Sequence, residues 1–236
     1  MEFQPNLIIQ GIQLPLALGD FKLIAFDMDS TLINIECIDE IAELVGKKKE
    51  VSDITDAAMR GDITDYKESL RLRVAMLKGI PASTLSDVYQ NKLRFNPGAE
   101  NLVSACQKAG MKILLVSGGF TYFTDRVRDH LGIDFTRSNV LEIDNGFLTG
   151  RMADQPWGSI CDGEEKKRML IQTCSDMGIS LTQSIAMGDG ANDLPMMSVA
   201  GLSVAYCAKP IVREQANVAI LEGGLDRLLA IFQPPD

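Results

Sequence analysis

Three runs of apolar residues, each ending in a polar turn, dominate the hydropathy pattern of this chain. They span residues 23–29, 112–119 and 184–193. Continuous apolar runs of this length are typical of strands buried on both faces of a parallel sheet. A helical pattern follows each run, so the chain is predicted to be α/β, with a doubly wound, Rossmann-like, mostly parallel sheet. Ligands bind beyond the carboxyl ends of such strands, so the three polar turns should meet at one crevice.

Shorter apolar segments add weaker strand candidates. Residues 202–207 and 218–221 are candidates for further strands, and residues 7–9 for an edge strand. Residues 140–150 alternate around Asn145-Gly146, a dipeptide typical of a tight hairpin turn. We therefore expect a β-hairpin there.

The first two main strands stand unusually far apart in the sequence. About eighty residues separate them, where one crossover helix would normally suffice. Between about Glu36 and Phe95 apolar residues recur at helical spacing: Ile38, Ile41, Ala42, Val45, Tyr66, Leu70, Val74, Leu77, Leu85 and Val88. We predict a helical cap domain over residues 36–94, inserted into a discontinuous core domain formed by residues 1–35 and 95–236.

Composition narrows the possible functions. The 236 residues carry 23 Lys plus Arg against 32 Asp plus Glu, a formal net charge of −9. Such a field repels a phosphate backbone, which argues against a nucleic-acid partner. No apolar run approaches the ~18 residues of a membrane span, and residues 1–10 lack the basic start of a signal peptide. Five cysteines without a Cys-x-x-Cys pair suggest free thiols. We expect a cytoplasmic protein with no membrane partner.

The chain has a single histidine, His130, inside an amphipathic helical pattern. Catalytic triads and multi-histidine metal sites are therefore excluded, and hydrolytic chemistry must use carboxylates. Asp27 and Asp29 could simply cap a solvated turn. However, a second acidic turn over residues 188–193 and a Ser-Gly-Gly turn at 117–119 end the other buried strands. Converging carboxylates repel one another unless a hard cation lies between them, and all-oxygen ligation suits Mg²⁺. Such a cation would make an anionic phosphate a tolerable ligand.

Three charged residues outside the strand ends are further candidates. Lys166 lies in a charged run, where position alone does not distinguish it from Lys167 or Arg168. Arg73 falls in the middle of the apolar stripe of its predicted helix, so its guanidinium should be buried and need an anionic partner. Glu36 opens the inserted segment close to the first strand, where it could also be an ordinary first-turn acid interacting with the helix dipole.

Four ordered motifs carry a family resemblance. They are Asp27-Met28-Asp29-Ser30-Thr31, Ser117-Gly118-Gly119-Phe120, Lys166, and Gly188-Asp189-Gly190-Ala191-Asn192-Asp193. This set resembles the haloacid dehalogenase superfamily of aspartate-nucleophile phosphatases, and within it the phosphoserine phosphatases, over about residues 21–232. The resemblance implies Mg²⁺-dependent hydrolysis of the small molecule O-phospho-L-serine to L-serine and phosphate, the last step of serine biosynthesis, through an aspartyl-phosphate.

The resemblance also implies catalytic roles. Asp27 would be the nucleophile, and Asp29 would protonate the leaving serine oxygen and then deprotonate the hydrolytic water. Ser117 and the Gly118 N–H would bind phosphate oxygens. Lys166 would neutralise charge on the nucleophile and on the transferred group.

The implied metal ligands come from two of the strand ends. Mg²⁺ would be held by Asp27, Asp189 and the backbone carbonyl of Asp29. Asp193 would support the water shell of the ion or Lys166, and Asn192 would contact the phosphate side of the site.

The inserted helices would select the substrate. By resemblance, Glu36 would bind the substrate ammonium, Arg73 its carboxylate, and Met59 would shield the site. Two features depart from the pattern of the related phosphatases. The segment between Met59 and Ser69 is one residue longer, with Asp65-Tyr66 where Phe is usual, and residues 154–158 form an apparent insertion.

Two other functions remain open at this point. The same chemistry could act on another small phosphomonoester, as a phosphatase or phosphotransferase. Alternatively, the chain could be a non-catalytic regulator that binds phosphoserine. A homodimer through the core is a further expectation.

Overall fold

The computed structural model describes residues 2–63, 65–158 and 160–233. The strands are β1 (Glu2–Gln4), β2 (Leu7–Ile9), β3 (Leu23–Phe26), β4 (Lys112–Phe120), β5 (Phe135–Asp144), β6 (Phe147–Ala153), β7 (Ser184–Gly188), β8 (Leu202–Tyr206) and β9 (Val218–Ile220). The α-helices are α1 (Cys37–Glu43), α2 (Lys48–Arg60), α3 (Tyr66–Ala75), α4 (Ser83–Asn91), α5 (Ala99–Lys108), α6 (Thr121–Leu131), α7 (Gly163–Asp176), α8 (Leu194–Met197) and α9 (Pro210–Gln215).

The strands of the described residues form one mixed sheet in the order β1-β2-β9-β8-β7-β3-β4-β5-β6. Strand β3 pairs in parallel with both β4 and β7, so the three predicted apolar runs are adjacent central strands. Strands β8 and β9 continue the parallel sheet, as the weaker candidates predicted. The predicted α/β class with a mostly parallel sheet is confirmed.

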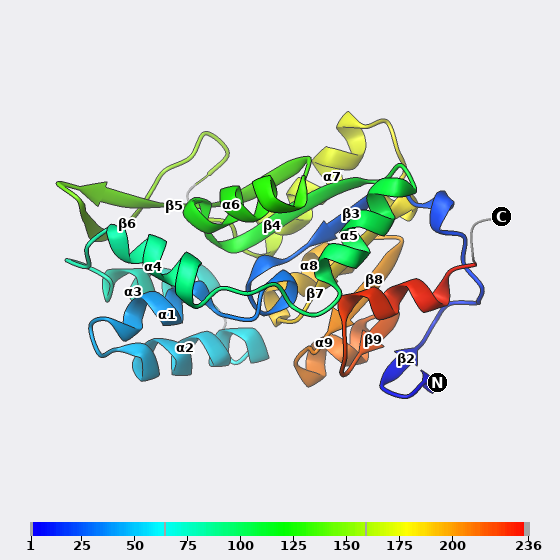
Figure 1. The fold of residues 1–236 in the computed structure, drawn as a ribbon, viewed down its shortest axis with the longest axis horizontal. Helices are drawn as coiled ribbons and strands as arrows, with labels where there is room; N and C mark the ends of the chain where they lie inside the picture. Colours follow the sequence, from blue (N-terminus) through cyan, green and yellow to red (C-terminus); the bar gives the residue numbers. More distant parts are fainter. Residues whose placement is uncertain (1, 64, 159, 234–236) are drawn as a thin grey trace.

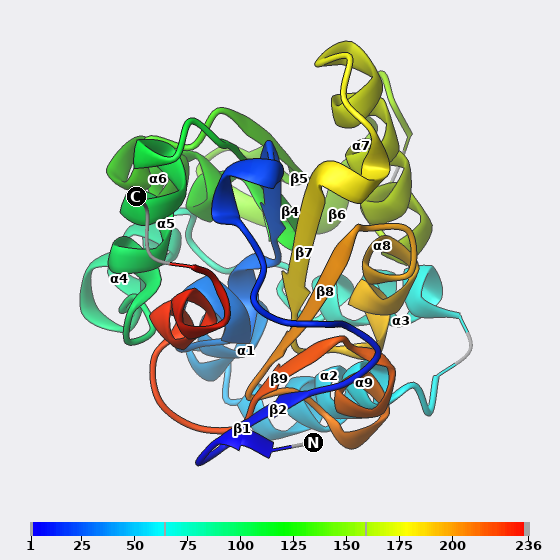
Figure 2. The same cartoon turned by 90° about the vertical axis from the view of Figure 1, so that its right-hand side faces the viewer.

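Helices cover both faces of this sheet (Figure 2). Alternate residues of β3 point to opposite faces: Ile24 and Phe26 join the apolar cluster beneath α5 and α6, and Leu23 and Ala25 join the cluster beneath α7 and α8. Strands buried on both faces need apolar residues at every position, which explains the continuous apolar runs.

Helices α1 to α4 follow β3 in the chain and lie together at one end of the molecule (Figure 1). Of the ten apolar positions predicted to form the helical stripes, eight are buried, Tyr66 is half-buried and Val45 is exposed. Val45 is 41% exposed because α1 ends at Glu43, so the expectation that it continues the helical stripe is wrong. The division into a cap of residues 36–94 and a two-part core stays a prediction, and residues 1, 64, 159 and 234–236 of those ranges lie outside the described residues.

Two peripheral predictions have different outcomes. Strands β5 and β6 form the expected hairpin, and Asn145 and Gly146 both adopt the positive φ angles, 47° and 82°, that a tight hairpin turn requires. Strand β2, expected at the edge, instead lies between β1 and β9. Among the described residues, no helix is both long and apolar enough to cross a membrane.

Candidate active site

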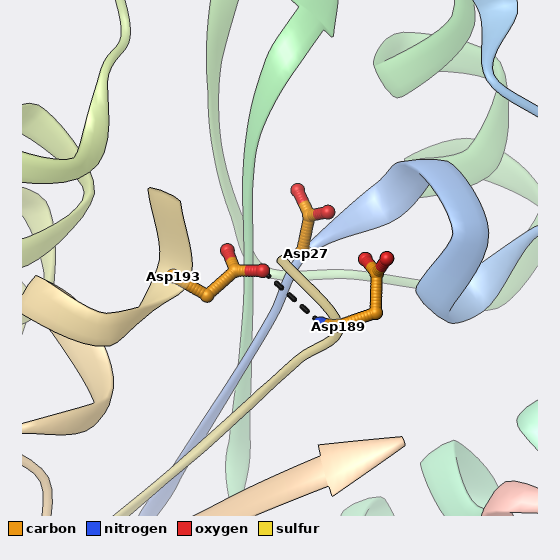
Figure 3. A group of neighbouring side chains, drawn as sticks. All are labelled: Asp27, Asp189 and Asp193. Carbon is orange, nitrogen blue, oxygen red and sulfur yellow. Dashed lines mark hydrogen bonds between the residues drawn. The ribbon is translucent and has the colours of Figure 1, made fainter. Parts of the chain in front are cut away.

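The carboxyl ends of β3 and β7 bring three aspartates together (Figure 3). Asp27 directly follows β3, whereas Asp189 and Asp193 belong to the turn after β7. One carboxylate oxygen from each lies within 4.8 Å of the other two, and all three side chains are buried. The predicted convergence of the acidic turns is thus present in the structure.

Lys166 provides the positive charge of this cluster. Its Nζ lies 2.6 Å from Asp27 Oδ1 and 2.7 Å from Asp193 Oδ1, and its side chain is fully buried. It occupies the first turn of α7, which begins where the Asp162 carboxylate caps the Glu165 N–H. Lys167 is half-buried and Arg168 is exposed, so burial distinguishes Lys166 from its neighbours in the charged run.

Asp193 uses both of its oxygens to organise the turn after β7. Oδ2 accepts hydrogen bonds from the backbone N–H groups of Asp189 and Gly190, each at 3.1 Å, while Oδ1 accepts from Lys166. Asp189 Oδ1 accepts from Thr31 Oγ1 at 3.2 Å. Asp193 therefore fixes the loop and the lysine, and it leaves the carboxylates of Asp27 and Asp189 for a ligand.

The turn after β3 aims Asp29 back toward α1. Ser30 adopts a left-handed conformation with φ of 56°, which is unusual for a non-glycine residue and reverses the chain here. Asp29 Oδ1 then accepts a hydrogen bond from the backbone N–H of Cys37 at 3.0 Å, at the beginning of α1. The sequence alone gave no sign of the backbone conformation of Ser30.

The end of β4 leaves no room for side chains at two glycines. A Cβ atom on Gly118 would lie 2.2 Å from the Tyr66 hydroxyl oxygen, and one on Gly119 would lie 2.6 Å from Asp29 Oδ2. The Ser117 hydroxyl accepts from the Gly119 N–H at 2.8 Å. A side chain at either position would displace Tyr66 or Asp29, because these groups of the site approach the backbone closely.

Glu36 immediately precedes α1 and faces the same pocket as Asp27 and Asp29. Ser30 Oγ donates a hydrogen bond of 2.6 Å to Glu36 Oε1. Burial, and then the negative charges of Asp29 and Asp189, raise the pKa of Glu36 well above its usual value. A cationic ligand group beside Glu36 would offset this repulsion.

Arg73 on α3 is only 2% exposed, as its place in the apolar stripe predicted. Nη1 donates to Thr55 Oγ1 at 3.0 Å, and Thr55 Oγ1 in turn donates to Asp39 Oδ1 at 2.8 Å. The buried Nη2 has no hydrogen-bond partner among the described residues. An unpaired buried donor of a charged group is costly, and an anionic ligand at this atom would remove that cost.

One pocket joins these groups. It is lined by Asp27, Asp29, Glu36, Ile38, Met59, Tyr66, Leu70, Arg73, Gly118, Gly119, Phe120 and Asn192, from the strand ends and from α1, α2 and α3. Met59 packs against the turn after β7, since its sulfur lies 2.4 Å from where a Cβ on Gly190 would be. The buried Asn192 Oδ1 lacks a hydrogen-bond partner among the described residues. Four of the predicted site residues, Ser117, Lys166, Asp189 and Asp193, do not line this pocket, and the others line it directly.

Sequence reasoning missed the functional placement of Tyr66, Thr55 and Ser30. Tyr66 was identified as a member of the apolar stripe and as a position where Phe is usual, yet its hydroxyl reaches Gly118. Thr55 lies one helical turn before Met59 on α2, so the same inward face of that helix could have indicated it.

The acidic groups of the site are strongly perturbed. Burial raises the pKa of Asp27 well above its usual value, against the opposing charge of Lys166 and with further increases from Asp193 and Asp189. Burial and then Asp193 raise the pKa of Asp189 to about 7. Burial also raises the pKa of Asp29, although its hydrogen bonds with Cys37 oppose the shift. The carboxylates of the cluster carry more negative charge than one lysine balances. A divalent cation would supply the missing positive charge.

None of the residues set aside in the sequence lines the pocket, although Cys37 lies next to it and donates a hydrogen bond to Asp29 through its backbone N–H. His130 is hydrogen-bonded to Glu100 at 2.8 Å and stacks on Phe95. The five cysteines are free thiols, and Cys207 is the exposed one. Trp157, in the apparent insertion at residues 154–158, lies under the Arg137 guanidinium, 4.9 Å from ring centre to Cζ.

Comparison with known proteins places this geometry in a family. Residues 24–198 match the model of haloacid dehalogenase-like hydrolases. The chain is 68% identical to the phosphoserine phosphatase of Albidiferax ferrireducens over 230 residues, covering 98% of this chain and 97% of the relative. It is also 68% identical to the phosphoserine phosphatase of Polaromonas sp. over 232 residues, covering 98% of each.

Solved structures give the same result. A phospho-aspartyl intermediate analogue of a phosphoserine phosphatase superposes with a TM-score of 0.85 at 37% identity, covering 90% of this chain and 99% of that one. A substrate-bound phosphoserine phosphatase complex superposes with a TM-score of 0.84 at 36% identity and the same coverage. The chain belongs to the haloacid dehalogenase-like hydrolase family.

Proposed function

We propose that this protein hydrolyses O-phospho-L-serine to L-serine and phosphate, as the last step of serine synthesis. One observation carries the choice of substrate: the pocket places a carboxylate, Glu36, and an unpaired guanidinium nitrogen, Arg73 Nη2, around Asp27. An amino-acid phosphate ester has an ammonium for the first and a carboxylate for the second. The relatives at 68% identity, named phosphoserine phosphatases, support the same substrate.

The first half-reaction breaks the ester bond. A carboxylate oxygen of Asp27 attacks phosphorus, an aspartyl-phosphate forms, and the serine oxygen leaves with a proton from Asp29. The raised pKa of Asp29 favours the protonated form that this step needs. Lys166, 2.6 Å from Asp27, offsets the negative charge of the nucleophile and of the phosphoryl group. Ser117 and the Gly118 N–H bind phosphoryl oxygens.

The second half-reaction releases phosphate. Asp29, deprotonated after the first step, takes a proton from water as the water oxygen attacks phosphorus. The bond to Asp27 breaks, its carboxylate is restored, and Asn192 contacts the departing phosphate. Splitting the displacement in two allows one carboxyl group to serve first as acid and then as base.

The donor set fits a magnesium ion. Asp27 and Asp189 offer buried oxygens close together, with pKa values raised by burial and mutual repulsion. Together with the backbone carbonyl of Asp29 they would hold Mg²⁺, whose oxygen preference they match. When bound, the ion would withdraw negative charge from a phosphoryl oxygen.

The helical segment of residues 36–94 would act as a cap that excludes water from the intermediate. Two ion pairs join it to the core around the pocket: Lys209 to Asp56 on α2 at 2.9 Å, and Lys67 on α3 to Asp162 at 3.2 Å. Met59, which lies on α2, would shield the bound substrate. A cytoplasmic location and a homodimer stay predictions from the sequence.

A substrate comparison tests the proposed function. Phosphate release is measured from O-phospho-L-serine and from p-nitrophenyl phosphate, each with Mg²⁺ and with EDTA. We expect metal-dependent release with a strong preference for phosphoserine. Release from the generic ester alone would contradict the substrate, and binding of phosphoserine without release would indicate a regulator.

A further inference from the structure

Tyr66 places a hydroxyl group inside the pocket. It is the first residue of α3, which the Asp65 carboxylate caps through the N–H of Glu68 at 3.0 Å. From there the ring extends over the end of β4, where its Oη lies 2.2 Å from the position of a Cβ on Gly118. The phenol oxygen therefore lies directly above the Gly118 backbone, the group to which we assign a phosphoryl oxygen.

Among the described residues, no hydrogen bond is made by Tyr66 Oη, although the side chain lines the pocket beside Arg73. Burial raises the pKa of Tyr66 to about 12, against the lowering effects of Arg73 and Lys166, so the hydroxyl keeps its proton at neutral pH. It is a hydrogen-bond donor facing the space that a ligand would fill.

We propose that Tyr66 Oη donates a hydrogen bond to a non-bridging oxygen of the substrate phosphoryl group, beside the Gly118 backbone. This assignment rests on the proposed function. The phosphoryl group is the partner because Oη overlies Gly118 and lies within electrostatic range of Lys166 and Asp27. The substrate carboxylate instead has the unpaired Nη2 of Arg73.

The hydroxyl would complete the shell of donors around the phosphoryl oxygens. Ser117 and the Gly118 N–H approach from the end of β4 and Lys166 from α7, whereas Tyr66 approaches from α3 in the helical segment. The phosphoryl group would therefore be bound fully only when α3 is in the position that brings the Tyr66 hydroxyl to it. A phenylalanine would preserve the ring and its packing on Arg73 but would turn a carbon edge toward the phosphoryl oxygen.

Tyr66→Phe tests this assignment without altering the shape of the pocket. The readouts are the inhibition constant of inorganic phosphate and kcat/KM for phosphoserine and for p-nitrophenyl phosphate. A hydrogen bond to a charged oxygen predicts roughly tenfold or greater weakening of phosphate binding. The same fold-loss in kcat/KM should appear for both esters, because both carry the phosphoryl group.

Tyr89→Phe is the matched control, since it removes a hydroxyl from α4, outside the pocket lining. Unchanged phosphate inhibition in Tyr66→Phe would overturn the assignment. A loss confined to phosphoserine would also overturn it, because the hydroxyl would then contact the amino-acid part. Phosphate binding, measured by calorimetry, needs no turnover of phosphoserine, so failure of the proposed substrate is distinguishable from failure of the Tyr66 assignment.

Discussion

Replacing Arg73 by methionine removes the group that we assign to the substrate carboxylate while keeping an unbranched side chain on a buried face. In the structure, Nη1 donates to Thr55 at 3.0 Å, Nε lies 3.4 Å from the Ser69 carbonyl, and Nη2 has no partner among the described residues. The substitution therefore removes few protein contacts. Its main effect should fall on the ligand.

The magnitude follows from the charge of both partners. Hydrogen bonds to charged groups contribute about 1.5–3 kcal/mol, and a guanidinium can make two to one carboxylate. A loss of about 3 kcal/mol corresponds to roughly a hundredfold fall in kcat/KM for phosphoserine. p-Nitrophenyl phosphate lacks the carboxylate, so its kcat/KM should stay nearly unchanged.

The assay compares both esters with Arg73→Met and with the control Arg71→Met, which alters an exposed arginine two residues away. Thermal unfolding of each variant separates a lost contact from lost folding. Equal losses on the two esters by a folded Arg73→Met variant would refute the reasoning, because the arginine would then support the pocket rather than select the amino acid.

Three further outcomes follow from the buried groups. Lys166→Met should abolish turnover. It should also lower the free energy of unfolding by about 3–5 kcal/mol, because it leaves two buried carboxylates without their positive partner. Urea denaturation without metal measures this, and a stability equal to wild type would contradict it. Gly118→Ala should inactivate the enzyme, and Tyr66→Phe should restore part of the activity, since the nearest remaining Tyr66 atom, Cζ, lies 3.3 Å from the added Cβ; no recovery in phosphate-release assays would count against steric conflict as the cause. Burial raises the pKa of Asp39 from 3.8 to about 6, so the folded protein holds this proton more tightly than the unfolded chain and stability should fall as pH rises from about 4 to 6. Asp39→Asn should lack that contribution, up to about 3 kcal/mol in denaturation curves taken at pH 4 and pH 8, and equal pH dependence in both proteins would disprove it.

The sequence predicted most of the core because its signals are local and repeated. Continuous apolar runs identify β3, β4 and β7, and parallel strands necessarily bring their carboxyl ends to one edge of the sheet. The hairpin turn at Asn145-Gly146 depends on two residues that tolerate positive φ, which the sequence displays directly. Arg73 was placed correctly by helical periodicity alone.

The remainder depends on tertiary contacts that leave little trace in local patterns. The helical spacing of apolar residues predicted that α1 extends to Val45, but the helix ends at Glu43 and the Val45 side chain is exposed. The left-handed Ser30 is stabilised by its surroundings, including its hydrogen bond to Glu36. The reach of the Tyr66 hydroxyl to Gly118 depends on how α3 packs against β6 and α2, which sets its position relative to the end of β4. No local rule specifies such a distance between segments far apart in sequence.

The most direct test of the account is detection of the covalent intermediate. The protein is mixed with O-phospho-L-serine and Mg²⁺, quenched in acid within one turnover, digested, and mapped by mass spectrometry. We predict one phosphoryl group on the peptide that carries Asp27, and none in Asp27→Asn treated alike. Phosphate release without that modification, or a phosphoryl group on another residue, would contradict the assignment of Asp27 as the nucleophile.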